Sequence, residues 1–174
     1  LSCSALSFPT IEKQLTDAAN KHNHKIWIPH GALLGVDGLL DSQTMLKSVS
    51  ISSIKSPKNL DFSFTNHISS NDISQPTLLY EGPTRGLAQM FPRNFNSHVA
   101  IALASLGLDE TTSKFVADPE INVGRHTITA QGEGFKFEIF QNSLMTGVTG
   151  DYTLFSTWGS VQRLLNTHSG INFI

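Results

Sequence analysis

The sequence predicts an α+β fold, with one open, mostly antiparallel sheet covered by helices. Two runs that alternate apolar and polar residues, at 45–55 and 125–142, are typical of half-buried strands. The second run contains a Gly-Glu-Gly turn at 132–134 and therefore indicates a β-hairpin. Runs with apolar residues at helical spacing, at 83–91, 94–106 and 149–165, supply the covering helices.

Composition limits the classes of function. The 174 residues suffice for one domain with a core of its own. A net charge of -2 gives no electrostatic reason to expect nucleic acid or an anionic membrane as a partner. No apolar run approaches the roughly 18 residues of a membrane span, and the opening residues do not resemble a signal peptide. The single cysteine, Cys3, fits a reducing compartment, so we expect a cytoplasmic protein.

The first 28 residues predict a strand–helix–strand unit, the last step of a parallel sheet. Residues 1–6 have the pattern of a strand end, and Pro9 suits the first turn of the helix that follows. The short apolar run 25–28, ended by Pro29, predicts the second strand. Because the pattern starts in the middle of an element, we expect a piece of a longer protein.

The remaining elements follow in order. Residues 45–55 predict a strand, and the polar stretch 56–76 predicts a variable excursion in which Leu60, Phe62 and Phe64 could add a short strand. A strand is expected at 77–82, a short helix at 83–91 and a helix at 94–106, with Asn94 as its N-cap. After strands at 113–119 and 125–142, a helix over 149–165 carries an apolar stripe of Leu154, Trp158, Val161 and Leu165.

The segment IPHGALLGVDGLL, residues 28–40, contains three glycines within eight residues. Its spacing differs from the GxGxxG of dinucleotide-binding turns. By spacing alone it favours a tight packing site, where glycines let two backbones approach closely. His126, at the start of a strand, and Asn96, at the start of a helix, are equally compatible with structural roles. His22 and His24 lack the partners of a metal site, so we expect no metal.

Four segments occur in a characteristic order: IPHGALLGVDGLL, LYEGPTRGLAQMFPRNFNSHVAIALASLGLD, KFVADPEINVGRHTITAQGEGFKFEI and VTGDYTLFSTWGSVQRLL. Together they resemble the L-aspartate dehydrogenase family, and its animal members most closely, over essentially the whole chain. The resemblance implies a Rossmann domain that binds NAD or NADP, followed by a catalytic and dimerisation domain. Residues 1–28 would be a remnant of the first domain and 29–174 the second, so we expect no activity from these residues alone.

The resemblance also implies roles for individual residues. His126 matches the family's catalytic histidine, which would act as general acid and base on the amine or the attacking water. Asn96 matches an asparagine that contacts the cofactor, and Ala32 a position that lies against it. Arg93 replaces a family lysine and is a candidate for binding a substrate carboxylate, as is His30, which replaces a serine.

Two departures from the family pattern leave the substrate open. Besides His30, Gly124 stands where an asparagine often precedes the catalytic histidine. The expected partners are a small amino-acid substrate and a second copy of the chain, which would pack through the sheet as a homodimer. The alternatives are a non-catalytic dimerisation module without a cofactor domain, and a related two-domain dehydrogenase of the homoserine or dihydrodipicolinate reductase type.

Overall fold

The computed structural model describes residues 2–65 and 68–165, and its centre is a mixed six-stranded sheet. The strand order is β2-β3-β1-β4-β5-β6, and only β1 and β3 pair in parallel. The α+β prediction is therefore confirmed. The strands are β1 (Leu46–Lys55), β2 (Thr77–Pro83), β3 (Thr112–Ala117), β4 (Val123–Gly132), β5 (Phe135–Thr146) and β6 (Thr149–Gly150).

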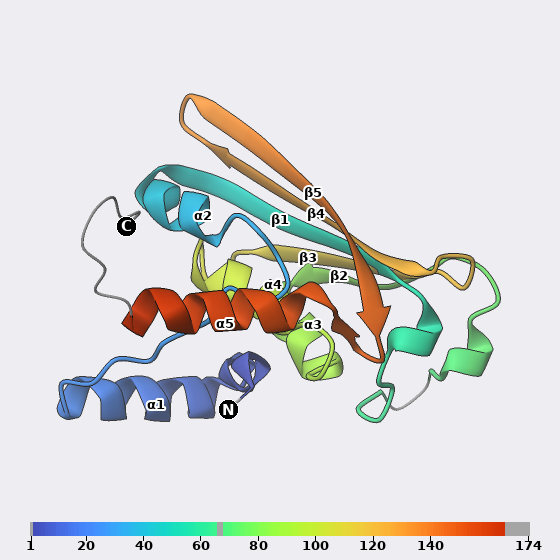
Figure 1. Cartoon of the computed structure of the whole chain (residues 1–174), viewed down its shortest axis with the longest axis horizontal. Coiled ribbons are helices and arrows are strands. Elements are labelled where there is room, and N and C mark those ends of the chain that lie inside the picture. Colours follow the sequence, from blue (N-terminus) through green and yellow to red (C-terminus); the bar gives the residue numbers. More distant parts are fainter. Residues whose placement is uncertain (1, 66–67, 166–174) are drawn as a thin grey trace.

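The helices gather on one side of this sheet (Figure 1). They are α1 (Pro9–Lys21), α2 (Val36–Ser42), α3 (Thr84–Met90), α4 (Asn96–Leu103) and α5 (Tyr152–Leu165). Short 3-10 helices cover Cys3–Ser7, Gln43–Met45, Pro57–Asn59 and Ser70–Asp72. Among the residues that the structure describes, no helix is both long and apolar enough to cross a membrane. The other face of the sheet carries no helix in the described ranges, and Phe140 and Leu144 of β5 are largely exposed there.

The core lies between the helices and the central strands. Alternation along β1 and β4 places every second side chain on the helical side, as a pleated strand requires. Besides a small cluster that joins α3 and α4, two buried clusters lie against the sheet, one under α2 and α4 and a phenylalanine-rich one under α3. They consist respectively of Leu33, Val36, Leu39, Val49, Ile51, Ile101, Ala104, Ile128 and Ala130, and of Ile73, Leu87, Phe91, Phe95, Phe115 and Ala117.

Both strands predicted in the first 28 residues are absent. Residues 3–7 form a 3-10 helix, η1, and 25–28 are extended without strand pairing. A strand needs a neighbour for its backbone groups. At Ser7 two side chains bind the backbone in place of a neighbouring strand: Gln89 Nε2 donates to Ser7 O at 2.7 Å, and Arg85 Nη1 donates to the same oxygen at 3.1 Å. The predicted helix between the two segments is confirmed as α1, whereas the domain boundary after residue 28 stays a prediction.

The region around α4 also corrects the prediction. The helix begins at Asn96 and its N-cap is Phe95, with no side-chain cap, so Asn94 was the wrong choice. The Asn94 side chain instead accepts a hydrogen bond from Asp61 N–H and donates one to Asn59 O, at 2.9 and 2.8 Å. These bonds tie down the chain between the 3-10 helix Pro57–Asn59 and Asp61, and residues 60–64 form no strand, so the short strand considered there does not form.

The apolar stripe of α5 is present but faces outward. Leu154, Trp158 and Leu165 are 76%, 60% and 71% exposed, and Val161 is also exposed. The helix packs on the domain through its small polar side, where Ser156 is buried and Ser160 Oγ accepts a hydrogen bond from His30 N–H at 3.4 Å. An amphipathic pattern thus located the helix correctly but not the direction of its apolar side.

Candidate functional site

His126 lies on the helical side of β4, with only 5% of its surface exposed. Ser53 is its direct partner across the β1–β4 pairing, and Ser53 Oγ lies 2.7 Å from His126 Nδ1. The same hydroxyl lies 2.6 Å from Nε2 of His98, a buried residue of α4. The two imidazoles are therefore joined through one hydroxyl group at the C-terminal end of β1.

A chain of buried hydroxyl groups continues beyond His98. His98 Nδ1 lies 2.9 Å from Ser113 Oγ, and Ser113 Oγ lies 2.8 Å from Thr84 Oγ1. Thr84 then donates to the backbone carbonyl of Thr111 at 2.9 Å. We call the sequence His126–Ser53–His98–Ser113–Thr84–Thr111 O the histidine relay. It crosses from β4 through β1, α4 and β3 to the start of α3.

Burial keeps both histidines neutral. It lowers the pKa of His126 to about 3, and the positive charge of Lys55 contributes in the same direction. Burial also lowers the pKa of His98 well below its usual value, with smaller effects of the charges of His126 and Lys55. Each ring therefore carries one proton at neutral pH, which lets each accept a hydrogen bond on one nitrogen and donate one on the other.

Lys55 supplies a buried positive charge beside this site. Its ammonium group donates to Asn94 O at 2.9 Å and lies 4.7 Å above the Phe95 ring. Burial lowers its pKa from 10.5 to about 8. A buried ammonium group is costly without a charged partner, and such groups are frequent at functional sites.

The glycine segment lies over His126 and the start of α4. Gln141 of β5 is the direct partner of His126 in the β4–β5 pairing, and its Nε2 donates to Ala32 O at 2.6 Å. Ala32 N–H donates to Ser97 Oγ at 3.3 Å, next to Asn96. Hydrogen bonds therefore link Ala32 to the strand pair that carries His126 and to the first turn of α4, which begins at Asn96, while the predicted roles of these three residues stay predictions.

The second glycine of this segment, Gly35, is required by its backbone conformation and by a close neighbour. Its φ is +93°, and a Cβ there would collide with Ile139 Cδ1. Gly31 also has a positive φ and lies close to the backbone of Ser97. Gly38 has open space around it, so the close backbone approach expected of the glycines in this segment does not occur at Gly38.

Asn96 is partly committed to the N-terminal segment. Its Oδ1 accepts hydrogen bonds from Ser2 Oγ at 2.6 Å and from Ser4 N–H at 2.8 Å. Its Nδ2 makes no hydrogen bond within the described ranges. The amide group therefore has donor capacity left, as a residue that contacts a carboxamide would need.

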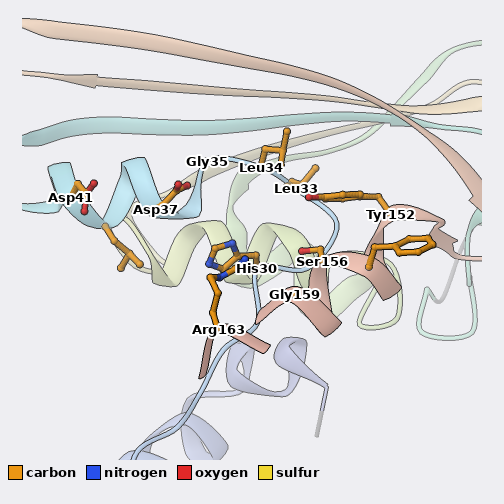
Figure 2. Close-up of a pocket in the computed structure, with 12 residues that line it drawn as sticks. His30, Leu33, Leu34, Gly35, Asp37, Asp41, Tyr152, Ser156, Gly159 and Arg163 are labelled. Carbon is orange, nitrogen blue, oxygen red and sulfur yellow. The ribbon is translucent and has the colours of Figure 1, made fainter. Parts of the chain in front are cut away.

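His30 lies apart from the relay, in a cavity of about 670 Å³ between α2 and α5. Figure 2 shows its ring beside Arg163 of α5, with Asp37 and Asp41 on α2. Burial lowers the pKa of His30, the Arg163 charge adds to this effect, and Asp37 opposes it. The cavity combines charges of both signs with apolar walls from Leu33 and Leu40.

Arg93 lies at the surface, where its guanidinium group pairs with Asp61 at 3.0 Å. It is 67% exposed, while Asp61 is only 11% exposed. No hydrogen bond or ion pair joins Arg93 to His126 in the described ranges, so its role in binding a substrate carboxylate stays a prediction.

The sequence pattern does not identify Gln141, Ser53 and Lys55 as neighbours of the site. The first two are the cross-strand partners of His126, so the strand register alone identifies them. Lys55 follows Ser53 by two residues and faces the same side of β1. The hairpin was predicted, but the pairing of β1 with β4 joins segments more than 70 residues apart and has no local signal.

A mixed sheet with helices gathered on one face is the architecture expected for the second domain of a two-domain amino-acid dehydrogenase. Residues 37–164 match the family model described as "Aspartate dehydrogenase, C-terminal". The chain belongs to this family, as the resemblance of its motifs predicted.

Relatives with curated names agree. The chain is 33% identical to an L-aspartate dehydrogenase of Nitrosopumilus maritimus over 136 residues, which are 76% of this chain and 50% of that protein. It is 37% identical to an L-aspartate dehydrogenase of Acinetobacter baumannii over 121 residues, 68% of this chain and 46% of that one. The chain thus spans about half the length of these relatives.

A solved structure has the same fold. The aspartate dehydrogenase of Thermotoga maritima superposes with a TM-score of 0.73 at 24% identity, covering 99% of this chain and 66% of that one. The α+β architecture of the chain is therefore that of an aspartate dehydrogenase C-terminal domain.

Proposed function

We propose that this chain is the catalytic domain of an NAD(P)-dependent L-aspartate dehydrogenase, and that His126 is its general acid and base. The observation that carries the proposal is the convergence of Ala32, Gln141 and His126, in which one amide side chain joins the glycine segment to the partner strand of the histidine. The family assignment and the names of the relatives support the reaction class.

The reaction converts aspartate into iminoaspartate, with loss of the Cα hydride and one amine proton, and water then releases oxaloacetate and ammonia. The nicotinamide ring, when bound, supplies the hydride acceptor. His126 removes one proton from the amine and releases it to solvent, and in the second half it removes one proton from the attacking water and passes it to the departing ammonia. A neutral imidazole can do both, since it offers a lone pair at neutral pH.

The residues present fit a nicotinamide group. Ala32 has a small side chain, and both of its backbone polar groups are already bonded, to Ser97 and Gln141, so its position is fixed. The unused Nδ2 of Asn96 suits the oxygen of a carboxamide. These two residues would therefore hold the ring against the site.

The charge of Lys55 gives the site a way to respond to an acidic substrate. Burial is the main cause of the lowered pKa of His126, and the charge of Lys55 lowers it further. A substrate carboxylate placed near Lys55 would offset it and raise the pKa of His126 toward the value that suits a base at neutral pH. Arg93 and His30 stay candidates for the second carboxylate.

The test is the turnover of the intact gene product. We expect NADH or NADPH to be oxidised with oxaloacetate and ammonia, and the reverse reaction to occur with aspartate. His126→Ala should lower kcat by about 100- to 10,000-fold, whereas His24→Ala, at an exposed position, should leave kcat unchanged. Absence of turnover with either cofactor would overturn the reaction, and an unchanged kcat in His126→Ala would overturn the role of His126.

We also propose that the chain pairs with a second copy through the uncovered face of the sheet. Phe140 and Leu144 project from β5 on that face and are 65% and 66% exposed. Exposed apolar side chains on a helix-free sheet face suit an isologous dimer contact. The non-catalytic alternative would retain this contact and lack turnover.

A further inference from the structure

We infer that the histidine relay fixes His126 as the tautomer with its proton on Nδ1 and its lone pair on Nε2. Ser53 and His98 are then positioning residues, which act on His126 through its Nδ1 atom. The catalytic meaning of this inference rests on the proposed function, in which His126 is the general base. The tautomer itself depends only on the hydrogen bonds.

The direction of the relay is set at its far end. The Thr111 carbonyl can only accept a hydrogen bond, so the single hydroxyl proton of Thr84 points to it. Thr84 Oγ1 must then accept in its second contact, which makes Ser113 the donor at 2.8 Å. With the proton of Ser113 used in this way, Ser113 Oγ accepts from the next residue.

The same logic carries through both histidines. His98 Nδ1–H donates to Ser113, so the lone pair of neutral His98 lies on Nε2 and accepts from Ser53 O–H. Ser53 has no second proton, and it therefore accepts from His126 Nδ1–H. One proton per imidazole leaves His126 Nε2 unprotonated.

Neutral rings are required for this chain, and their surroundings favour them. Burial is the main cause that lowers the pKa of both His126 and His98, and the charge of Lys55 adds to it in each case. No carboxylate bonds to either ring in the described ranges, where the partners are hydroxyl groups. If His98 were protonated, Ser53 would accept from it and donate to His126, and the tautomer would be the opposite one.

The unprotonated nitrogen is also the accessible one. His126 Nε2 makes no hydrogen bond in the described ranges, and no side-chain polar atom there is both buried and without a partner, so Nε2 retains contact with solvent. Gly124 provides that room, because a Cβ on it would lie 3.3 Å from Nε2 and 3.0 Å from Met145 Sδ. The lone pair is thus on the ring nitrogen that retains contact with solvent.

The first measurement needs no variant. Long-range proton–nitrogen spectra of the protein labelled in its histidine rings report which nitrogen carries the proton. We expect His126 to show a protonated Nδ1 and an unprotonated Nε2 at neutral pH. Free histidine in water prefers the opposite form, so a protonated Nε2 in the wild-type protein would overturn the inference.

A pair of matched variants tests the origin of the direction. Thr84→Val removes the hydroxyl that points to the Thr111 carbonyl, and the carbonyl keeps its bond from Thr84 N–H at 2.9 Å. Ser113 is then free to donate to His98, so we expect Nε2–H of His126 to appear. Thr111→Val removes an equally buried hydroxyl and leaves the carbonyl, so the tautomer should not change. A change in both variants, or in neither, would contradict the relay.

Activity separates this inference from the proposed function. The tautomer is read without substrate, so it can be tested even if the intact protein has no dehydrogenase activity. If the protein is active, kcat of Thr84→Val should fall in proportion to the fraction of His126 with a protonated Nε2, while KM stays the same. A fall in kcat without any Nε2–H form would show that Thr84 acts in another way and would overturn the inference.

Discussion

Gln141 and His126 are direct cross-strand partners on β5 and β4, and the amide group of Gln141 bonds Ala32 O at 2.6 Å and Leu34 N at 3.2 Å. The Gln141 side chain therefore fixes the position of the glycine segment relative to His126. Both hydrogen bonds are made to backbone groups, so the contact depends on the amide of Gln141 and not on the identity of the residues it holds.

Gln141→Met should loosen the glycine segment while keeping the length of the side chain. Gln141 Nε2 also donates to Ser143 Oγ at 3.1 Å, and each lost hydrogen bond is worth about 1 kcal/mol, so the free energy of unfolding should fall by roughly 2–3 kcal/mol. The KM for cofactor should rise more than kcat falls, because Ala32 belongs to the proposed cofactor site. Gln131→Met, at an exposed position of β4, is the control for urea unfolding and kinetics. Equal behaviour of the two variants would refute the prediction.

Gly124→Ala should hinder the approach to His126. The added Cβ would lie 3.3 Å from His126 Nε2 and press on Met145 Sδ at 3.0 Å. We expect kcat of the intact enzyme to fall by about tenfold or more, since small displacements at a reacting group are costly. Gly38→Ala adds the same methyl group in open space and should leave kcat unchanged. Normal turnover in Gly124→Ala would show that this side of the ring is not used.

The buried histidines should make the protein sensitive to acid. The pKa of His126 is about 3 in the folded protein, against 6.5 for the ordinary residue, and that of His98 is also lowered. Between these pH values the unfolded chain binds more protons, so stability falls as the pH falls below 6.5. The slope should reach about 1.4 kcal/mol per pH unit for each histidine.

Urea unfolding between pH 7 and pH 4 checks this dependence. His98→Gln should lower the slope of the free energy of unfolding against pH by the contribution of one histidine. His24→Gln, at an exposed position, should leave this slope unchanged. A stability that stays constant from pH 7 to pH 5 would mean that the rings are protonated in the folded state, contrary to their burial.

The proposed dimer predicts a concentration-dependent mass. Replacing Phe140 and Leu144 together by aspartate should shift sedimentation toward the monomer, because like charges would face each other across an isologous contact. Phe155→Asp, on α5 and 76% exposed, introduces charge on the helical side and is the control. If the wild-type chain is a monomer at micromolar concentration, or if only Phe155→Asp dissociates it, the sheet contact is wrong.

Local pattern was sufficient for most elements of the sheet. The β4–β5 hairpin and β1 follow from alternation, since one face of each is buried against helices. The strands expected at 1–6 and 25–28 failed for the opposite reason. Their residues have strand character, but no described strand lies beside them to satisfy their backbone groups.

The site was predictable only in part. His126, Asn96 and Ala32 were proposed from the family motifs, and the structure links Ala32 through Ser97 to the start of α4 and through Gln141 to the partner strand of His126. Ser53 and Gln141 depend on strand register, and the direction of the apolar side of α5 depends on what the helix contacts. Neither is encoded in a local spacing of residue types.

The far end of the histidine relay is a main-chain carbonyl, which every amino acid at position 111 would supply. Mutational drift at that position therefore cannot reverse the polarity of the site, whereas loss of the hydroxyl at Thr84 can. The protonation pattern of His126 therefore depends on a main-chain group at position 111 and not on the side chain there. A designer who transplants the histidine to another scaffold must carry over the loop that holds this oxygen as well.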